Sequence, residues 1–444
     1  MKKVNAIILA AALCTTSLVG CAESSKGDSS AASNSGEATT TAAESSKAKS
    51  VELTVVTSYG GDDGNRKNYE AAYKAYETAS GNKIKDASGT AVEEWKSKVL
   101  ADFETGAEPD VLFYFSGVDS NPFVESGKVV SLDEIRKVYP DYAGNMKDDL
   151  LVASPADGKK YTVPVNGYWE GLYVNKKVLA DSGVDVPGAD YTWEQFLKDC
   201  EAIKSKGYTP IAASLQEVPH YWFEFTVFNH GSVATHNTLP ASSSDAAGKA
   251  WASGLNDIKT MFENGYFPAN TTTATDAETF QMMADNKAAF AIDGSWKLGW
   301  FAENAQNIDD FTVTYVPSQG ERKATDMIGG LSMGYYITKK AWDDPEKQKA
   351  CVDFITAMTT DEVVSSFGAT AVTALKNGTI APSDADSLQK AALAMTKGAT
   401  GVAPATQDNL KQTARTALFA DVKNVATGKT TAEAAVDAAL AIKE

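Results

Sequence analysis

Short strand-like segments that alternate with amphipathic helices constrain the fold of this chain more than any other feature. The segment "VELTVVTS", which starts at Val51, is rich in β-branched residues and predicts a short strand before the loop "GGDDGN". The next segment, "RKNYEAAYKAYETASG", places Tyr69, Tyr73 and Tyr76 on one helical face and ends near Gly81. This rhythm of strand, loop and helix predicts an α/β architecture.

The same rhythm continues along the chain. "VEEWKSKVLADFETG" repeats the helical step, and "PDVLFYFSG" predicts a buried strand. Further strands are expected at "TPIAAS", "AAFAIDGSW" and "LSMGYYIT", and long amphipathic helices at "DPEKQKACVDFITAMTTDE" and "TAEAAVDAALAIKE". A length of 444 residues leaves room for two or three domains at roughly 100 to 200 residues each.

The first twenty residues have the pattern of an export signal. Lys2 and Lys3 precede the apolar run "VNAIILAAAL", which is shorter than the roughly 20 residues that a membrane span needs. "LVGC" at 18–21 resembles the bacterial lipobox, which predicts cleavage after residue 20 and a diacylglycerol on Cys21. An ordinary signal peptide with an incidental cysteine is the alternative.

Residues 21–50 have the composition of a tether. The stretch after Cys21 is almost entirely small and polar, so it cannot bury enough apolar surface to order itself. As a flexible coil it would hold the folded part very roughly 30 Å from the membrane.

Charge and side-chain chemistry exclude several classes of function. The formal net charge is −17 and no basic cluster appears, so we expect no nucleic-acid partner. Cys200 and Cys351 lie on apolar helical faces, which favours two buried thiols over a disulfide. The three histidines lack zinc-ligand spacing, and no phosphate loop or dinucleotide fingerprint is present, so we expect neither a metal nor a cofactor.

Four segments, in order, resemble the extracellular solute-binding proteins of bacterial ABC importers, in particular the carbohydrate group that includes maltose-binding protein. They are "LADFETGAEPDVLFYFSG", "DGKKYTVPVNGYWEGLYVNKKVLADSGVDVPGADYTWEQF", "AAFAIDGSW" and "GGLSMGYYITKKAWDDPEKQKACVDFITAMTTDE". Together they cover most of the chain from residue 51 to about 365. Residues 366–444 match only as a helical region.

The resemblance implies a two-lobed α/β fold of the type II periplasmic-binding-protein kind. Two or three crossing strands would join the lobes, and the ligand would lie in the cleft between them. By analogy we place the first lobe at 51–162 plus 295–340 and the second at 163–294 plus 341–444.

The segment "VNGYWEGLYVNK" at 165–176 gathers aromatic residues around two glycines. We expect Tyr173 and Val174 to enter a core strand, whereas the resemblance places "NGYWEG" at the cleft. One face of a pyranose is a patch of C–H groups that can lie on an aromatic ring. The candidate stacking rings are Trp169, Trp222 and Trp296, with core packing as the alternative for Trp169.

Sugar hydroxyl groups need donors and acceptors around such rings. The candidates are Asn166, Glu170, Glu217, His220 and Asp293. Asp293 has an equally good alternative as the N-cap of a helix in "GSWKLGW".

The remaining candidates for ligand contact are nominated by where their loop or strand end lies in the predicted fold. The loop "SYGGDDGN" lies where the family contacts ligand, with a solvated acidic turn as the alternative. The strand end at "PDVLFYFS" is another such place, because ligands of open α/β sheets lie beyond the carboxyl ends of strands. These further candidates are Tyr59, Asp62, Asp63, Phe115, Ser116, Tyr168 and Gly330.

The sequence therefore predicts a monomeric, lipid-anchored receptor on the extracellular face of a Gram-positive type of cell membrane. It would bind a sugar, expected to be an oligosaccharide, and deliver it to ABC permease subunits driven by cytoplasmic ATPases. It would not be an enzyme. Two alternatives stay open: a polyamine binder that uses Asp62, Asp63, Glu170 and Glu217, and an exported glycosidase with a carboxylate pair drawn from Glu170, Glu217 and Glu224.

Overall fold

The computed structural model describes residues 50–442, apart from 62, 369–370 and 381. The predicted signal peptide, the lipidated Cys21 and the tether up to residue 49 lie outside the described residues, and so does Asp62. Residues 50–444 form one compact unit by their contacts.

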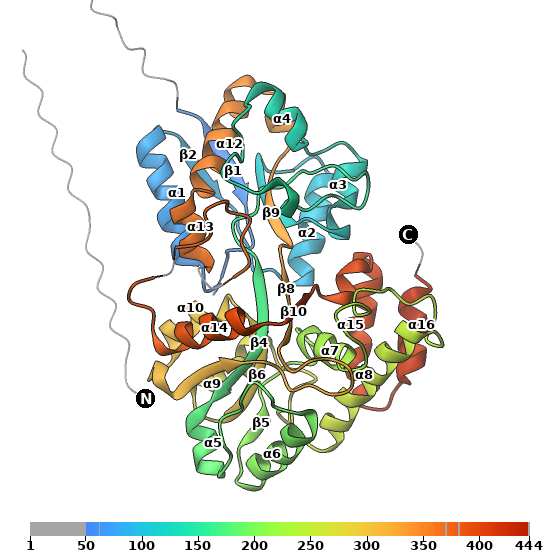
Figure 1. The fold of residues 1–444 in the computed structure, drawn as a ribbon. Coiled ribbons are helices and arrows are strands. Elements are labelled where there is room, and N and C mark those ends of the chain that lie inside the picture. Colours follow the sequence, from blue (N-terminus) through green and yellow to red (C-terminus); the bar gives the residue numbers. More distant parts are fainter. Residues whose placement is uncertain (1–49, 62, 369–370, 381, 443–444) are drawn as a thin grey trace, which may run out of the picture. The chain divides into compact units, whose positions relative to one another are not determined.

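Within this unit, the first lobe is built on a four-stranded sheet of order β2-β1-β3-β9 (Figure 1). β1 is parallel to β2 and to β3, whereas β9 is antiparallel to β3. The strands are β1 Glu52–Val56, β2 Lys83–Asp86, β3 Val111–Phe115 and β9 Met333–Ile337. The helices are α1 Arg66–Ser80, α2 Glu93–Glu104, α3 Asn121–Glu125, α4 Leu132–Val138, α11 Lys339–Trp342, α12 Pro345–Met358 and α13 Asp361–Gly368, with the short 3-10 turns η1 Val118–Ser120 and η2 Asp148–Leu150.

The second lobe is built on a six-stranded sheet of order β10-β8-β4-β6-β5, in which β7 also pairs with β4. The strands are β4 Tyr168–Asn175, β5 Thr209–Ile211, β6 Ala288–Gly294, β7 Phe311–Thr314, β8 Asp326–Gly330 and β10 Gly401–Ala403. The helices are α5 Lys176–Ser182, α6 Trp193–Ser205, α7 His220–Phe228, α8 Ala246–Glu263, α9 Asp276–Ala284, α10 Lys297–Asn304, α14 Ser387–Gly398, α15 Gln412–Ala426 and α16 Ala432–Leu440, with η3 Ile308–Asp310 and η4 Thr406–Asn409.

Local chemistry explains where several elements begin and end. α1 ends at Gly81, whose φ of 78° lets its N–H reach back to the carbonyl of Glu77. α6 and α9 each begin with a capping box, in which a threonine caps the helix and a residue three positions later returns the hydrogen bond. The predicted α/β alternation and the predicted two lobes are confirmed.

The division of the chain between the lobes differs from the expected one. Residues 297–316, expected in the first lobe, pack with the second sheet, because β4 pairs with both β7 and β8. Residues 341–375, expected in the second lobe, pack into the core of the first. The register of β9 against β3 explains this, because the chain enters the first lobe at Met333 and stays there through α13.

The chain passes between the lobes three times in the described residues: between Val163 and Tyr168, between Gly330 and Met333, and between Leu375 and Leu388. A hydrogen bond of 2.6 Å from the Gly167 N–H to the Val372 carbonyl joins the first passage to the segment that follows α13.

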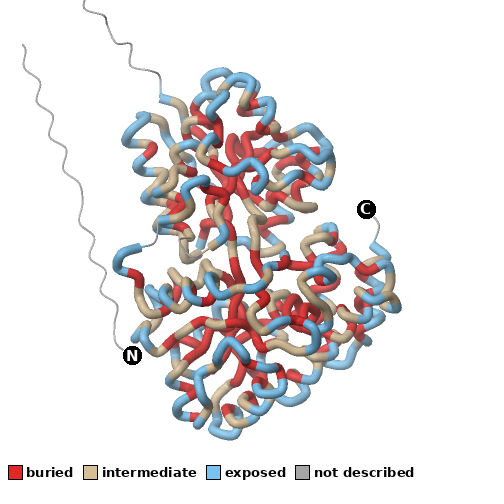
Figure 2. Tube along the Cα trace, viewed as in Figure 1, coloured by how far each residue is buried: buried red, intermediate tan, exposed pale blue. Residues whose placement is uncertain are grey.

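Figure 2 shows the buried positions gathered along both sheets. Cys200 lies in the core of the second lobe and Cys351 in that of the first. Both are buried free thiols, as predicted.

Candidate ligand-binding site

A cavity of about 470 Å³ lies between the two lobes. The first lobe supplies the carboxyl end of β3 with η1 and part of the segment 152–155. The second lobe supplies Tyr168, Asn237 and the segment 402–409, and the crossing residues 329–332 form the floor. The lining residues include Phe115, Ser116, Asp119, Tyr168, Gly330 and Asp408. Among these, Phe115, Ser116, Tyr168 and Gly330 are candidates that the sequence predicted.

Three aromatic rings from separate elements meet beside this cavity. Tyr168 begins β4, Tyr221 lies in the first turn of α7, and Trp296 immediately precedes α10. The ring centroid of Trp296 lies 6.3 Å from that of Tyr168 and 6.1 Å from that of Tyr221. All three residues are half-buried.

A glycine makes room for the central ring. A Cβ atom at Gly294 would lie 2.1 Å from the indole ring of Trp296, so a side chain at this position would displace it. The loop after β1 approaches the same segment from the other lobe, because a Cβ at Gly64 would lie 2.1 Å from the Trp296 carbonyl oxygen. The arrangement therefore brings backbone from both lobes against Trp296.

A buried pair of acids lies close to Tyr168. Glu170 is 3% exposed and Glu224 is 1% exposed. Burial, followed by the charges of Asp408 and Asp293, raises the pKa of Glu170 to about 8, although its hydrogen bond with Glu224 acts in the opposite direction. Burial and then the charge of Glu170 raise the pKa of Glu224. The pair therefore holds a proton at neutral pH, and the side-chain amide of Gln407 donates a hydrogen bond to Glu224 Oε1.

The other predicted acid near the aromatic rings, Asp293, lies at the end of β6 and is buried. Its Oδ1 accepts the Gly294 N–H at 2.7 Å, and its Oδ2 lies 3.5 Å from Lys297 Nζ. Burial raises the pKa of Asp293 to about 7, against the lowering effect of Lys297. The N-cap interpretation of Asp293 is wrong, because Trp296 occupies the N-cap of α10.

Buried ion pairs join the lobes at one side of the cavity. Arg415 of α15 forms two hydrogen bonds to Asp119 of η1, at 2.7 and 2.8 Å. Burial acts to lower the pKa of Arg415, but the carboxylates of Asp119, Asp408 and Glu93 outweigh it and raise the pKa. The guanidinium group is therefore charged at any pH in which the protein is folded.

Three predicted rings lie in cores. Trp222 is 1% exposed and stacks on Phe196 at 5.7 Å, whereas the ring of its neighbour Tyr221 contacts Trp296. Tyr59 stacks on Phe113 at 4.9 Å in the first lobe.

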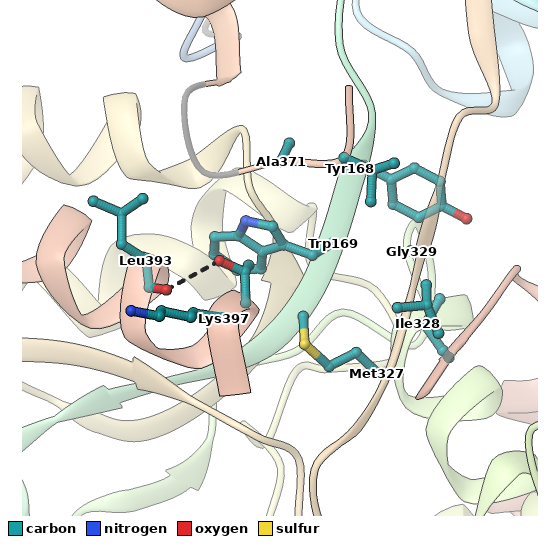
Figure 3. A pocket seen from close by; sticks show the side chains of 11 residues that line it. Tyr168, Trp169, Met327, Ile328, Gly329, Ala371, Leu393 and Lys397 are labelled. Carbon is teal, nitrogen blue, oxygen red and sulfur yellow. Dashed lines mark hydrogen bonds between the residues drawn. The ribbon is translucent and has the colours of Figure 1, made fainter. Parts of the chain in front are cut away.

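Trp169 is 2% exposed and points to the opposite side of β4 from Tyr168, because successive strand residues face opposite ways (Figure 3). It lines a second pocket of about 430 Å³, to which Tyr168 also contributes, against Leu393 and Lys397 of α14.

The remaining candidates have identifiable local roles. Glu217 is exposed and accepts the Asp276 N–H at 2.6 Å, at the start of α9. Asn166 lies in the first crossing and donates to the Gly167 carbonyl. Asp63 accepts the Asn65 N–H at 2.8 Å in the loop that approaches Trp296.

His220 stacks on Phe419 of α15 at 5.1 Å. Burial, followed by the charges of Lys96 and Arg415, lowers the pKa of His220 to about 3, so the ring is neutral.

The sequence did not identify Asp119, Tyr221, Asp408 or Arg415 as parts of the site. Tyr221 lies between the predicted residues His220 and Trp222, and the orientation of α7 decides that it is Tyr221 whose ring contacts Trp296. Asp408 and Arg415 lie in the helical region after residue 366, where no motif marks them. Only the docking of α15 against the first lobe brings Arg415 to Asp119.

Neither a metal site nor a membrane-spanning helix is found in the part of the chain that the structure describes. No three histidine, cysteine, aspartate or glutamate side chains in residues 50–442 come together as a metal site would require. No helix among the described residues combines the length and the apolar character needed to cross a membrane.

Two bacterial proteins are similar to this chain in sequence. A multiple sugar-binding protein of Streptococcus mutans is 22% identical over 280 residues, which cover 61% of this chain and 62% of that protein. A melibiose/raffinose/stachyose-binding protein of Bacillus subtilis is 23% identical over 244 residues, which cover 50% of this chain and 54% of that protein. The match thus spans less than two thirds of the length of either relative.

The similarity extends further in three dimensions. A chitin oligosaccharide binding protein of known structure is 23% identical, with a TM-score of 0.74 over 88% of this chain and 97% of that chain. This similarity shows a shared two-lobed fold. The model of one family matches residues 63–365, which is more than half of the chain: the chain belongs to the bacterial extracellular solute-binding proteins.

Proposed function

We propose that this protein binds an oligosaccharide in the interlobe cavity and delivers it to the membrane subunits of an ABC importer. The observation that carries the proposal is the group of three rings, Tyr168, Tyr221 and Trp296, beside a cavity bordered by carboxylates. Aromatic faces suit the C–H face of a pyranose, and carboxylates accept hydrogen bonds from hydroxyl groups. The names of the two bacterial relatives support the same class of ligand.

Binding would act through closure of the lobes. Both lobes line the cavity, so a ligand that touches both walls makes all its contacts only when the lobes are together. Such a ligand shifts the equilibrium from an open to a closed form. The closed form would be the one that the permease recognises.

The test is a thermal-shift screen followed by calorimetry. Raffinose, stachyose, chitin oligosaccharides and monosaccharides are compared with spermidine and amino acids. A ligand of the folded state raises the melting temperature by mass action. A shift with one class of saccharide supports the proposal, whereas a shift with spermidine alone would refute the sugar assignment.

A polyamine remains the second candidate because of one observation. Within the described residues, neither Glu170 nor Glu224 forms an ion pair, although the two carboxyl groups are in contact and buried. An ammonium group beside aromatic rings would satisfy such a pair. The spermidine arm of the screen distinguishes this ligand from a sugar.

We propose binding without turnover. A glycosidase holds the sugar bond between carboxyl groups that are about 5 Å or more apart. Glu170 and Glu224 are instead buried and do not line the cavity, and Glu217 accepts a backbone N–H at the start of α9. An oligosaccharide incubated with the protein is expected to be recovered intact by chromatography.

We also propose that the protein is a monomer anchored by a lipid on Cys21 at the outer face of the membrane of a Gram-positive type of cell. The pattern "LVGC" at 18–21 and the polar stretch that follows support this. Mass spectrometry of the N-terminal peptide should find diacylglycerol on Cys21. A Cys21→Ala variant should appear in the growth medium instead of the membrane fraction.

A further inference from the structure

Arg415 reaches from the second lobe to a carboxylate of the first. It lies in the first turn of α15, is 1% exposed, and binds both carboxylate oxygens of Asp119. Asp119 belongs to η1, which directly follows β3, and its side chain is 6% exposed. The two groups therefore form a bidentate ion pair that is shielded from water and joins the two lobes.

Further groups of the first lobe surround this pair. Glu93 Oε1 lies 3.4 Å from Arg415 Nε and 2.7 Å from Lys96 Nζ, and Lys96 Nζ lies 3.6 Å from Asp119. Two cations thus face two anions. On the same helix as Arg415, the Gln412 amide donates to Ser97 Oγ at 2.8 Å and adds an uncharged contact between the lobes.

We propose that the Asp119–Arg415 pair is a latch that holds the two lobes together and sets the proportion of closed protein before a ligand binds. The latch rests on the proposed closure of the lobes, since the two residues belong to different lobes and the bond requires that they meet. Asp119 lines the cavity, but both of its carboxylate oxygens bind Arg415, so the pair acts by positioning the walls of the cavity.

Removing one of the two charged groups costs different amounts of free energy in the open and in the closed form. In an open form each charged group is hydrated, so removing one of them costs little there. In the closed form, removal of one partner leaves the other buried without its bidentate partner, which is strongly unfavourable. Neutralising Asp119 should therefore lower the ratio of closed to open protein by about 10- to 100-fold, after allowance for the nearby Glu93.

A second ion pair between the lobes provides a matched control. Lys67 of α1 and Glu303 of α10 lie 2.6 Å apart, but their side chains are 78% and 47% exposed. Exposed pairs contribute little, so Glu303→Gln should change the closed-to-open ratio by less than about twofold. The comparison separates the loss of a buried pair from the loss of any ion pair between the lobes.

The experiment is small-angle X-ray scattering of the protein without added ligand, in which opening of the lobes raises the radius of gyration. Wild type, Asp119→Asn, Arg415→Gln, the double variant and Glu303→Gln are compared. We expect a closed population in the wild type, a shift to the open form in both single variants and in the double variant, and no change in Glu303→Gln.

Three results would overturn the latch: a wild type that is entirely open, an Asp119→Asn variant that scatters like Glu303→Gln, or a double variant as closed as the wild type. The last result would mean that the two charges only compensate each other. Circular dichroism checks folding. If Asp119→Asn does not fold, Arg415→Gln breaks the same pair from the other lobe, and an unchanged profile there contradicts the latch.

No sugar enters this measurement, so its outcome is independent of the ligand assignment. A protein with an intact latch that binds no saccharide would refute the proposed ligand alone. A protein that binds raffinose equally well with and without Asp119, and that scatters identically, would refute the latch alone.

Discussion

At the scale of single residues, the ring of Trp296 lies between those of Tyr168 and Tyr221. Its centroid lies about equally far from those of Tyr168 and Tyr221, at 6.3 and 6.1 Å. Nothing in the composition distinguishes this tryptophan from the others. Its position results from three elements, β4, α7 and α10, that begin at the same place.

Replacing Trp296 with alanine should weaken sugar binding at least about tenfold, because a stacking face is lost. Calorimetry with the sugar identified in the screen measures the change. Trp222→Phe provides the control, since Trp222 lies in the core of the second lobe. It should lower the melting temperature and leave affinity unchanged, and the opposite pattern would exchange the assigned roles of these two residues.

The acids Glu170 and Glu224 make stability depend on pH. Burial raises the pKa of Glu170 to about 8 from 4.5, so the folded state retains a proton that the unfolded state releases. The contribution of this group to stability is complete below pH 4.5 and is lost as the pH rises to about 8, and it amounts to at most about 5 kcal/mol. Wild-type stability should therefore fall over this range.

A Glu170→Gln variant removes this titration while keeping the size of the side chain. Its free energy of unfolding, measured with urea from pH 5 to pH 9, should depend less on pH than that of the wild type and exceed it at pH 9. Glu194→Gln on α6, where the side chain is 80% exposed, is the control. Parallel curves for wild type and Glu170→Gln would show that Glu170 does not titrate in this range.

At the scale of elements, close approach of backbone decides where the rings lie. Gly294 ends β6, and the indole of Trp296 covers the space that a Cβ would occupy. Gly117 also lies at the cavity, after β3, but a Cβ there meets no atom within 4 Å. A side chain can therefore be added at Gly117 without a clash, whereas at Gly294 it would displace Trp296.

Gly294→Ala should destabilise the protein by about 1 to 3 kcal/mol, because the ring must move, whereas Gly117→Ala should change stability by less than about 0.5 kcal/mol. Urea denaturation measures both. Equal stabilities would show that Trp296 can move away from β6 without cost.

The sequence predicted elements well where the pattern is local. β1 was expected from its β-branched run, β3 from the buried run that follows Pro109 and Asp110, and α1 from its tyrosine face and Gly81. Tyr221 and Trp222 could not be distinguished, because the orientation of α7 depends on packing against Phe196. Arg415 could not be placed at all, because its partner lies 296 positions away in the sequence.

At the scale of the whole molecule, the expected lobe boundaries differ from those of the structure because contacts between distant segments decide them. Residues 341–375 look like any amphipathic helical region, and only the pairing of β9 with β3 carries them into the first lobe. Pairings between distant segments leave no periodic signal in a single sequence. The ordered family motifs supplied the two-lobed fold, and they are silent about residues 366–444.

The C-terminal helices are part of the second lobe. Leu418, Val422 and Val436 are fully buried in its core. A chain that ends after Gly398 should lose the cooperative thermal transition of this lobe in calorimetry, because a large apolar face of α8 becomes exposed. A chain that ends after Leu440 should melt like the full chain, and a cooperative transition in the shorter chain would show that α15 and α16 are dispensable.

Each lobe is built from segments that lie far apart in the sequence, and this affects biosynthesis. The first lobe needs β9 and α12, and the second needs α15, so neither core can be completed on the ribosome until most of the polypeptide has been made. Contacts between such distant segments form slowly. We therefore expect a nascent chain with this topology to lack a completed core for most of its synthesis, a state that would suit passage through a narrow translocation channel.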